Sequence, residues 1–81
     1  MNSAIEERQV LERFRYHAPK MDQIPRYEEI RVTGAVFAKK LLDQCPPSRE
    51  RSLALTKLQE VVMWANASIA INEDVVEVKS E

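Results

Sequence analysis

The feature that most constrains the fold is the proline pair Pro46-Pro47, which separates two long stretches of helical pattern. The first covers residues 26–44, and the second starts at residue 48 and meets no further proline or glycine. A proline disfavours helical geometry at the residue before it, so the first helix has to end at Cys45. Because so short a turn carries the chain only a small distance, the two helices must run antiparallel and side by side. The sequence therefore predicts a helical hairpin.

Apolar residues recur at steps of three and four in both stretches, as they do on one face of a helix that packs along another helix. In the second stretch these residues are Leu55, Leu58, Val62, Ala65 and Ile69. In the first stretch they are Ala35, Ala38, Leu42 and Cys45.

Gly34 is the only glycine of the chain and lies inside the first stretch. A glycine there costs about 1 kcal/mol relative to alanine. One explanation is the close approach of another helix. The alternatives are the close approach of a ligand and a kink in the helix.

The flanks of the hairpin are less regular. Residues 3–14 are predicted to form a short helix, because Ser3 and Glu6 have the spacing of a capping box. Residues 15–25 hold two prolines among polar residues and are predicted to form an ordered loop. The acidic residues 72–81 are expected to form a flexible tail or a frayed helix end. The expected architecture is all-α, with one helical domain over residues 1–71 followed by this tail.

Size and composition limit what the chain can be. A domain of 81 residues hides only roughly 60–65% of the surface of its unfolded chain. With one cysteine and one histidine it gains neither an internal disulfide nor a structural zinc site. Association with further copies is the remaining way to stabilise so small a core, so we expect a homo-oligomer.

The charge balance and the chemical groups exclude several functions. Lys and Arg number 12 and Asp and Glu number 13, which argues against sequence-independent DNA binding. No apolar run approaches a membrane span and no signal-peptide pattern is visible, so an intracellular protein without membrane contact is expected. No Gly-rich loop and no nucleophile–base pairing is apparent. We therefore expect a binding protein with no cofactor, no metal and no catalytic residue.

Two clusters are candidates for binding. Residues 13–20 carry three fixed positive charges, a histidine and two aromatic rings, which suit phosphates and nucleobases. Arg26 and Arg31 follow on the next predicted helix, and we expect them to converge on the same place. The alternative is that the aromatic rings anchor the core while the arginines face solvent. The second cluster is the helix start at Ser48 and Arg49, which suits an anion or serves only as a helix cap.

Two residues of the long second stretch have a structural interpretation. Trp64 is interpreted as a packing anchor whose N–H finds one acceptor. Asn66 lies between two alanines, an arrangement that suits an oligomer seam at which an amide fixes the register.

The order of residues resembles that of a known family over about residues 12–71. The similarity is carried by Pro47-Ser48-Arg49-Glu50, by residues 52–58 and 63–70, and upstream by residues 16–20 and 26–31. The family is that of the phage anti-CBASS sponges, a helical-hairpin domain related to the phage sponges that counter Thoeris defence.

This resemblance implies a function. Members sequester the cyclic oligonucleotide messengers of bacterial immune cyclases without cleaving them, so that the effector is never activated. They assemble as homohexamers and take cyclic dinucleotides such as 3',3'-cGAMP in pockets shared by two protomers. Some also hold cyclic trinucleotides around a three-fold axis. Such a protein acts in the cytoplasm of the infected bacterial host.

The resemblance also suggests which residues bind. For cyclic dinucleotides these are Tyr16, His17, Pro19, Lys20, Arg26 and Arg31. For a second, trinucleotide site they are Ser48, Arg49 and Thr56. The alternative function is a small helical oligomerisation module that binds a phage or host protein. A large apolar patch left exposed after assembly, without a basic pocket between protomers, would distinguish that module.

Overall fold

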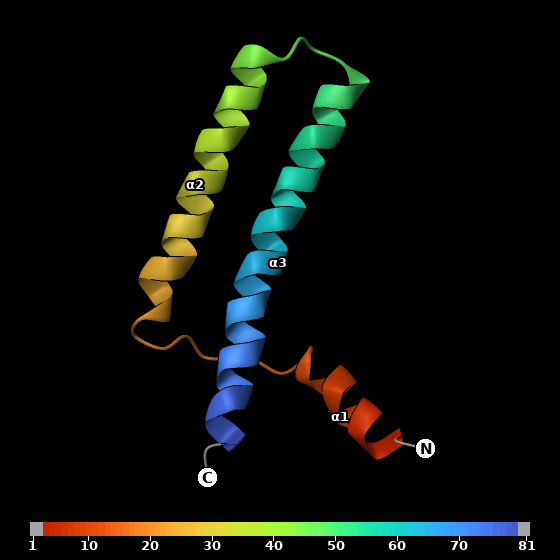
Figure 1. The fold of residues 1–81 in the computed structure, drawn as a ribbon, viewed down its shortest axis with the longest axis vertical. Coiled ribbons are helices and arrows are strands. Elements are labelled where there is room, and N and C mark those ends of the chain that lie inside the picture. The colour runs from red at the N-terminus through yellow and green to blue at the C-terminus, as the bar shows by residue number, and fades with distance from the viewer. Residues whose placement is uncertain (1–2, 80–81) are drawn as a thin grey trace.

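The computed structural model describes the backbone of residues 3–79 and the side chains of residues 3–73. The described chain consists of three helices, α1 (Ser3–Glu12), α2 (Gln23–Gln44) and α3 (Arg49–Lys79). Figure 1 shows α2 and α3 side by side and antiparallel, joined by the turn at one end. α1 leaves the other end, here called the open end, at an angle to the hairpin (Figure 1). The predicted all-α hairpin is confirmed.

The turn is closed by capping hydrogen bonds. The hydroxyl of Ser48 accepts a hydrogen bond from the backbone N–H of Arg51 at 3.1 Å, which confirms Ser48 as the cap of α3. The guanidinium of Arg51 donates to the carbonyl oxygens of Leu42 at 3.4 Å and Cys45 at 3.2 Å. Carbonyl groups in the last turn of a helix have no partner inside the helix. Arg51 therefore ties the end of α2 to the start of α3.

Gly34 marks a close approach of the two long helices. A Cβ atom placed on Gly34 would lie 2.6 Å from Cγ2 of Val62, whereas carbon atoms in contact are normally about 3.5–4.0 Å apart. The explanation by close approach of another helix is therefore confirmed. The glycine lets the backbone of α2 lie directly against a side chain of α3.

The acidic segment that begins at residue 72 starts inside α3, whose helical backbone continues to Lys79. The side-chain amide of Asn72 donates to the carbonyl oxygen of Ser68 at 3.0 Å, one turn earlier. Glu73 is tied to α2, as described below. The remaining side chains of this segment, and residues 80–81, lie outside the described part, so the expected flexibility of the tail stays a prediction.

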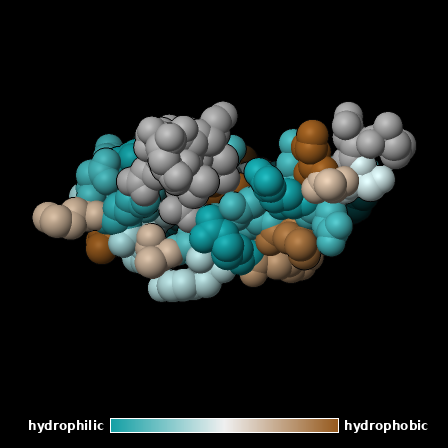
Figure 2. Space-filling model, turned by 90° about the horizontal axis from the view of Figure 1, so that it is seen from below, coloured by the Kyte–Doolittle hydropathy of each residue, from teal (hydrophilic) through white to brown (hydrophobic). Residues whose placement is uncertain are grey.

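The apolar side chains between α2 and α3 are at most half-buried over the residues whose side chains the structure describes. Among the described residues no hydrophobic side chain is buried, and Gln23, 2% exposed, is the only buried residue. Trp64, interpreted above as a packing anchor, is 70% exposed within the chain. Figure 2 shows brown, apolar groups at the surface between the teal, polar ones.

The dimensions agree with this limited burial. The accessible surface is 6760 Å², while a compact monomer of this mass exposes about 5,000 Å². The radius of gyration is 16.8 Å, against about 12 Å for a compact chain of this length. A single chain is therefore more extended than a compact globule of the same length. No described helix has the length and apolar character needed to cross a membrane.

Candidate functional site

The loop that carries most of the predicted site lies at the open end of the hairpin. It links the end of α1 to the start of α2 and crosses α3 in the view of Figure 1. α2 starts at Gln23, three residues before the predicted start, so the loop covers residues 13–22. Pro25 therefore falls in the first turn of α2, where the missing N–H of proline leaves no intrahelical hydrogen bond unmade.

The side chain of Gln23 holds this loop in place. Its Oε1 accepts a hydrogen bond from the backbone N–H of Lys20 at 3.0 Å. Its Nε2 donates to Oε1 of Glu73 on α3 at 2.8 Å. The hydroxyl of Tyr27 donates a longer hydrogen bond of 3.5 Å to the same Gln23 oxygen. Because Gln23 is buried, its amide is shielded from competing water, and it joins the loop, α2 and α3 in one network.

Arg26 joins the same network through a two-pronged ion pair. Its Nη1 lies 3.1 Å from Oε1 of Glu73 and its Nη2 lies 2.7 Å from Oε2. This hydrogen bond from Arg26, with a second one from Gln23, lowers the pKa of Glu73 below its ordinary value. The same contact raises the pKa of Arg26. A phosphate bound at Arg26 would have to share the guanidinium with this carboxylate or displace it.

The other predicted residues of the loop differ in how exposed they are and in whether they form hydrogen bonds within the chain. Tyr16 is 79% exposed, and Pro19 is exposed beside it. His17 is largely covered, and its Nε2 lies 3.0 Å from the carbonyl oxygen of Glu12. Lys20 is half-buried and bonded through its backbone to Gln23. The alternative interpretation, in which Tyr16 anchors the core, is wrong within the chain.

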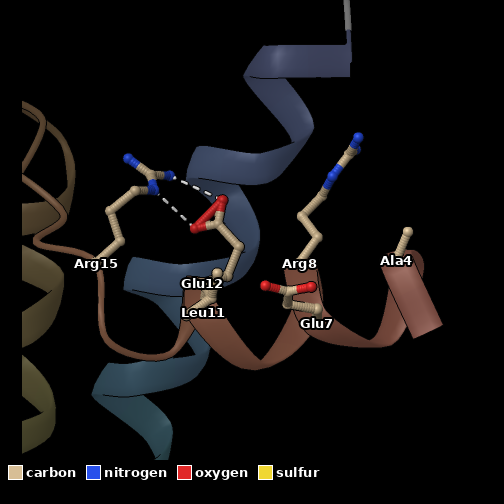
Figure 3. A pocket seen from close by; sticks show the side chains of 6 residues that line it. All are labelled: Ala4, Glu7, Arg8, Leu11, Glu12 and Arg15. Carbon is tan, nitrogen blue, oxygen red and sulfur yellow. Dashed lines mark hydrogen bonds and ion pairs between the residues drawn. The ribbon is translucent and has the colours of Figure 1, made fainter.

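Figure 3 shows the carboxylate of Glu12, at the end of α1, paired with the guanidinium of Arg15. Arg15 donates to its two oxygens at 2.7 and 3.1 Å. One of the three fixed positive charges of residues 13–20 is therefore paired inside the chain.

Arg31 does not converge with Arg26 in a single chain. The two lie five residues apart on α2, which places them about 140° apart around the helix axis. They flank the face on which Gly34 meets α3. Nη2 of Arg31 lies 3.7 Å from Oε1 of Glu28 on the same helix.

The second predicted cluster lies at the opposite end of the hairpin, near the turn. The hydroxyl of Ser48 also donates to the carbonyl oxygen of Pro46 at 3.1 Å, so it acts as a structural cap. Arg49 and Thr56 are exposed and seven residues apart, which puts them on the same face of α3. The 22 residues of α2 span about 33 Å. The two clusters therefore cannot form one pocket within a chain.

Sequence reasoning missed the role of Gln23 and Glu73, although a signal for it exists. Gly34 contacts Val62, and Gln23 contacts Glu73. The two contacts are 11 residues apart on each helix, since 34 − 23 = 11 and 73 − 62 = 11. Once the Gly34 contact fixes the register, the contact between Gln23 and Glu73 follows.

The fold and the site define a small helical-hairpin domain that leaves apolar side chains, the two aromatic rings of its loop and several basic groups at the surface. The family described as "Acb2/Tad1, hairpin domain" matches residues 6–70, which is most of the chain. The chain belongs to this family, that of the anti-CBASS and anti-Thoeris sponges. Comparisons with curated proteins and with solved structures gave no match. The resemblance drawn from the sequence is thus confirmed at the level of the family.

Proposed function

We propose that this protein binds cyclic oligonucleotide immune messengers and holds them without cleaving them, so that CBASS effectors are not activated. The observation that carries the proposal is the family match over residues 6–70. Capture in the cytoplasm of an infected bacterium, where the messengers are made, belongs to the same proposal.

The open end offers the chemistry that a cyclic dinucleotide needs. Such a ligand has two phosphates and two flat bases. Tyr16, 79% exposed, presents a ring on which a base can stack, and such stacking contributes about 1–3 kcal/mol per base. The proposed dinucleotide site consists of Tyr16, His17, Pro19, Lys20, Arg26 and Arg31. The proposed trinucleotide site consists of Ser48, Arg49 and Thr56.

We also propose a homo-oligomer, in particular a hexamer, with pockets shared between protomers. The chain exposes about 1,700 Å² more than a compact monomer of its mass. A specific protein interface buries about 1,200–2,000 Å² in total, which is about 600–1,000 Å² on each partner, so the excess corresponds to about two such interfaces per chain.

Calorimetric titration with a panel of cyclic dinucleotides and trinucleotides tests the proposal. Binding should be followed by recovery of intact ligand after denaturation of the protein. Lys20→Ala should weaken dinucleotide binding, while Lys39→Ala, which removes the same charge from an exposed position on α2, should leave the affinity unchanged. Linearised nucleotide in the recovered material would contradict sequestration.

Failure of every nucleotide to bind would refute the sponge. The alternative would then be a helical oligomerisation module for a phage or host protein. The exposed apolar side chains, such as Val61 at 60% and Met63 at 57%, favour that module as the second candidate.

A further inference from the structure

A groove lies between α1 and the C-terminal half of α3, and of the candidate binding cluster of residues 13–20 only Arg13 lines it. Its volume is about 970 Å³, at the upper end of the range of about 300–1,000 Å³ that small-molecule sites occupy. α1 contributes Arg8, and Arg13 follows directly after that helix. α3 contributes Trp64, Ser68 and Asn72.

The residues from α3 form an ordered row. Trp64, Ser68 and Asn72 succeed one another at steps of four, so they share one face of the helix. Trp64 is the only tryptophan of the chain, and its indole is 70% exposed. The row therefore sets a large flat ring beside a hydroxyl and an amide.

The residues from the α1 side add positive charge. Figure 3 shows the side chain of Arg8 extending apart from the pair formed by Glu12 and Arg15. Glu12, the carboxylate of the groove lining, receives two hydrogen bonds from Arg15. Within the described chain, neither Arg8 nor Arg13 forms an ion pair with a carboxylate. The groove thus holds two exposed guanidiniums that are available to an anionic group.

We propose that this groove is a further nucleotide site, in which a purine base stacks on Trp64 and phosphates are held by Arg8 and Arg13. Flat rings attached to negative charge are the ligand class that matches an exposed indole beside guanidiniums. Ser68 and Asn72 supply hydrogen-bonding groups for the base edge or the ribose. The inference rests on the proposed function, since the ligand is again a cyclic oligonucleotide, but its residues differ from those of both proposed sites.

The single tryptophan makes the test direct. The full chain is titrated with 3',3'-cGAMP while the emission of Trp64 is followed, and the same titration is repeated by calorimetry. A stacked base should quench the indole in a saturable manner. Trp64→Ala should weaken calorimetric binding roughly five- to 150-fold, while Trp64→Phe, which keeps a ring, should retain most of the affinity.

The charges are tested in parallel. Arg8→Ala combined with Arg13→Ala should weaken binding and make it less sensitive to salt, because fewer phosphate charges are neutralised. Lys39→Ala serves as the matched loss of charge outside the groove and should behave as the wild type.

Three outcomes would overturn the groove site in different ways. Calorimetric binding with unchanged Trp64 emission and unaffected groove variants would refute this site and leave the sponge function standing. A smaller assembly of Trp64→Ala or of the double arginine variant in light scattering would assign the groove to a contact between protomers. Absence of any binding to the wild-type chain would refute the groove together with the proposed function.

Discussion

Replacing Gly34 by alanine sets two opposing effects against each other. Alanine is better than glycine inside a helix by about 0.8–1 kcal/mol. The added Cβ, however, would lie 2.6 Å from Cγ2 of Val62, so the helices must separate by about 1 Å to restore an ordinary contact. Forcing an extra carbon into a packed contact costs about 1–3 kcal/mol. We therefore expect a net destabilisation of between about zero and 2 kcal/mol.

Thermal unfolding followed by circular dichroism measures this change. For a domain of this size, 1 kcal/mol shifts the melting temperature by roughly 4–8 °C. All variants are compared at one protein concentration, because association makes the melting temperature concentration-dependent. Ala35→Gly is the control, because residue 35 is the exposed neighbour of Gly34. It measures the difference between alanine and glycine in this part of α2 without the Val62 contact, and it should destabilise the hairpin by about 1 kcal/mol.

The decisive measurement is the same substitution made beside a smaller Val62. In a Val62→Ala background Cγ2 is gone, so Gly34→Ala should stabilise the hairpin by about the propensity difference alone. The effect of Gly34→Ala thus changes sign or size between the two backgrounds. Equal stabilisation in both backgrounds would show that the close approach of the helices does not constrain residue 34.

Three further substitutions test the contacts that close the hairpin. The pKa of Glu73 is lowered in the folded chain by Arg26, so its contribution to stability is present above the ordinary value of 4.5 and is lost as the pH falls through the lowered value. The melting temperature of the wild type should therefore exceed that of Glu73→Gln at neutral pH and approach it in acid. An unchanged difference would exclude this linkage. Arg51→Ala should destabilise by about 0.5–1.5 kcal/mol per carbonyl left without its donor, measured by urea unfolding with Arg49→Ala as the neutral neighbour. Ser48→Ala should cost about 0.5–2 kcal/mol through loss of the helix cap, and Ser48→Asp should recover most of it; equal losses in both variants would argue against the cap.

The hairpin was predictable because its signals are local. The proline pair fixes the turn, and the predicted stripe of α3 is half-buried throughout, as expected of a packing face. The stripe predicted in α2 was partly wrong, because Ala35 and Leu42 are exposed. The face of α2 that packs lies beside them and includes Gly34, which meets Val62. These features act over a few residues, so they can be read without knowing the rest of the fold.

The ends of the helices were harder to predict because they depend on contacts between distant residues. α2 begins at Gln23 although Asp22, the residue in the cap position, makes no capping hydrogen bond. The loop is held instead by the Gln23 side chain, which accepts from the backbone of Lys20. Glu73 belongs to a segment without apolar periodicity, and its part in the open end depends on the register of α3 against α2.

The candidate site was only partly predictable for a similar reason. The sequence places Tyr16 and Lys20 in one loop, and that loop lies at the open end. It does not reveal that Arg26 is held by a carboxylate from α3. It also cannot show that Trp64 stays at the surface, because an apolar ring on a helix is usually buried.

The equal spacing of the two helix contacts limits how the length of this protein can change. Between the Gly34 contact and the Gln23 contact each helix advances by 11 residues, since 34 − 23 and 73 − 62 are equal. An insertion of one residue in one arm alone would rotate everything beyond it by about 100° and advance it by about 1.5 Å. Gln23 and Glu73 would then no longer meet. Relatives that lengthen one arm are therefore expected to lengthen the other by the same number.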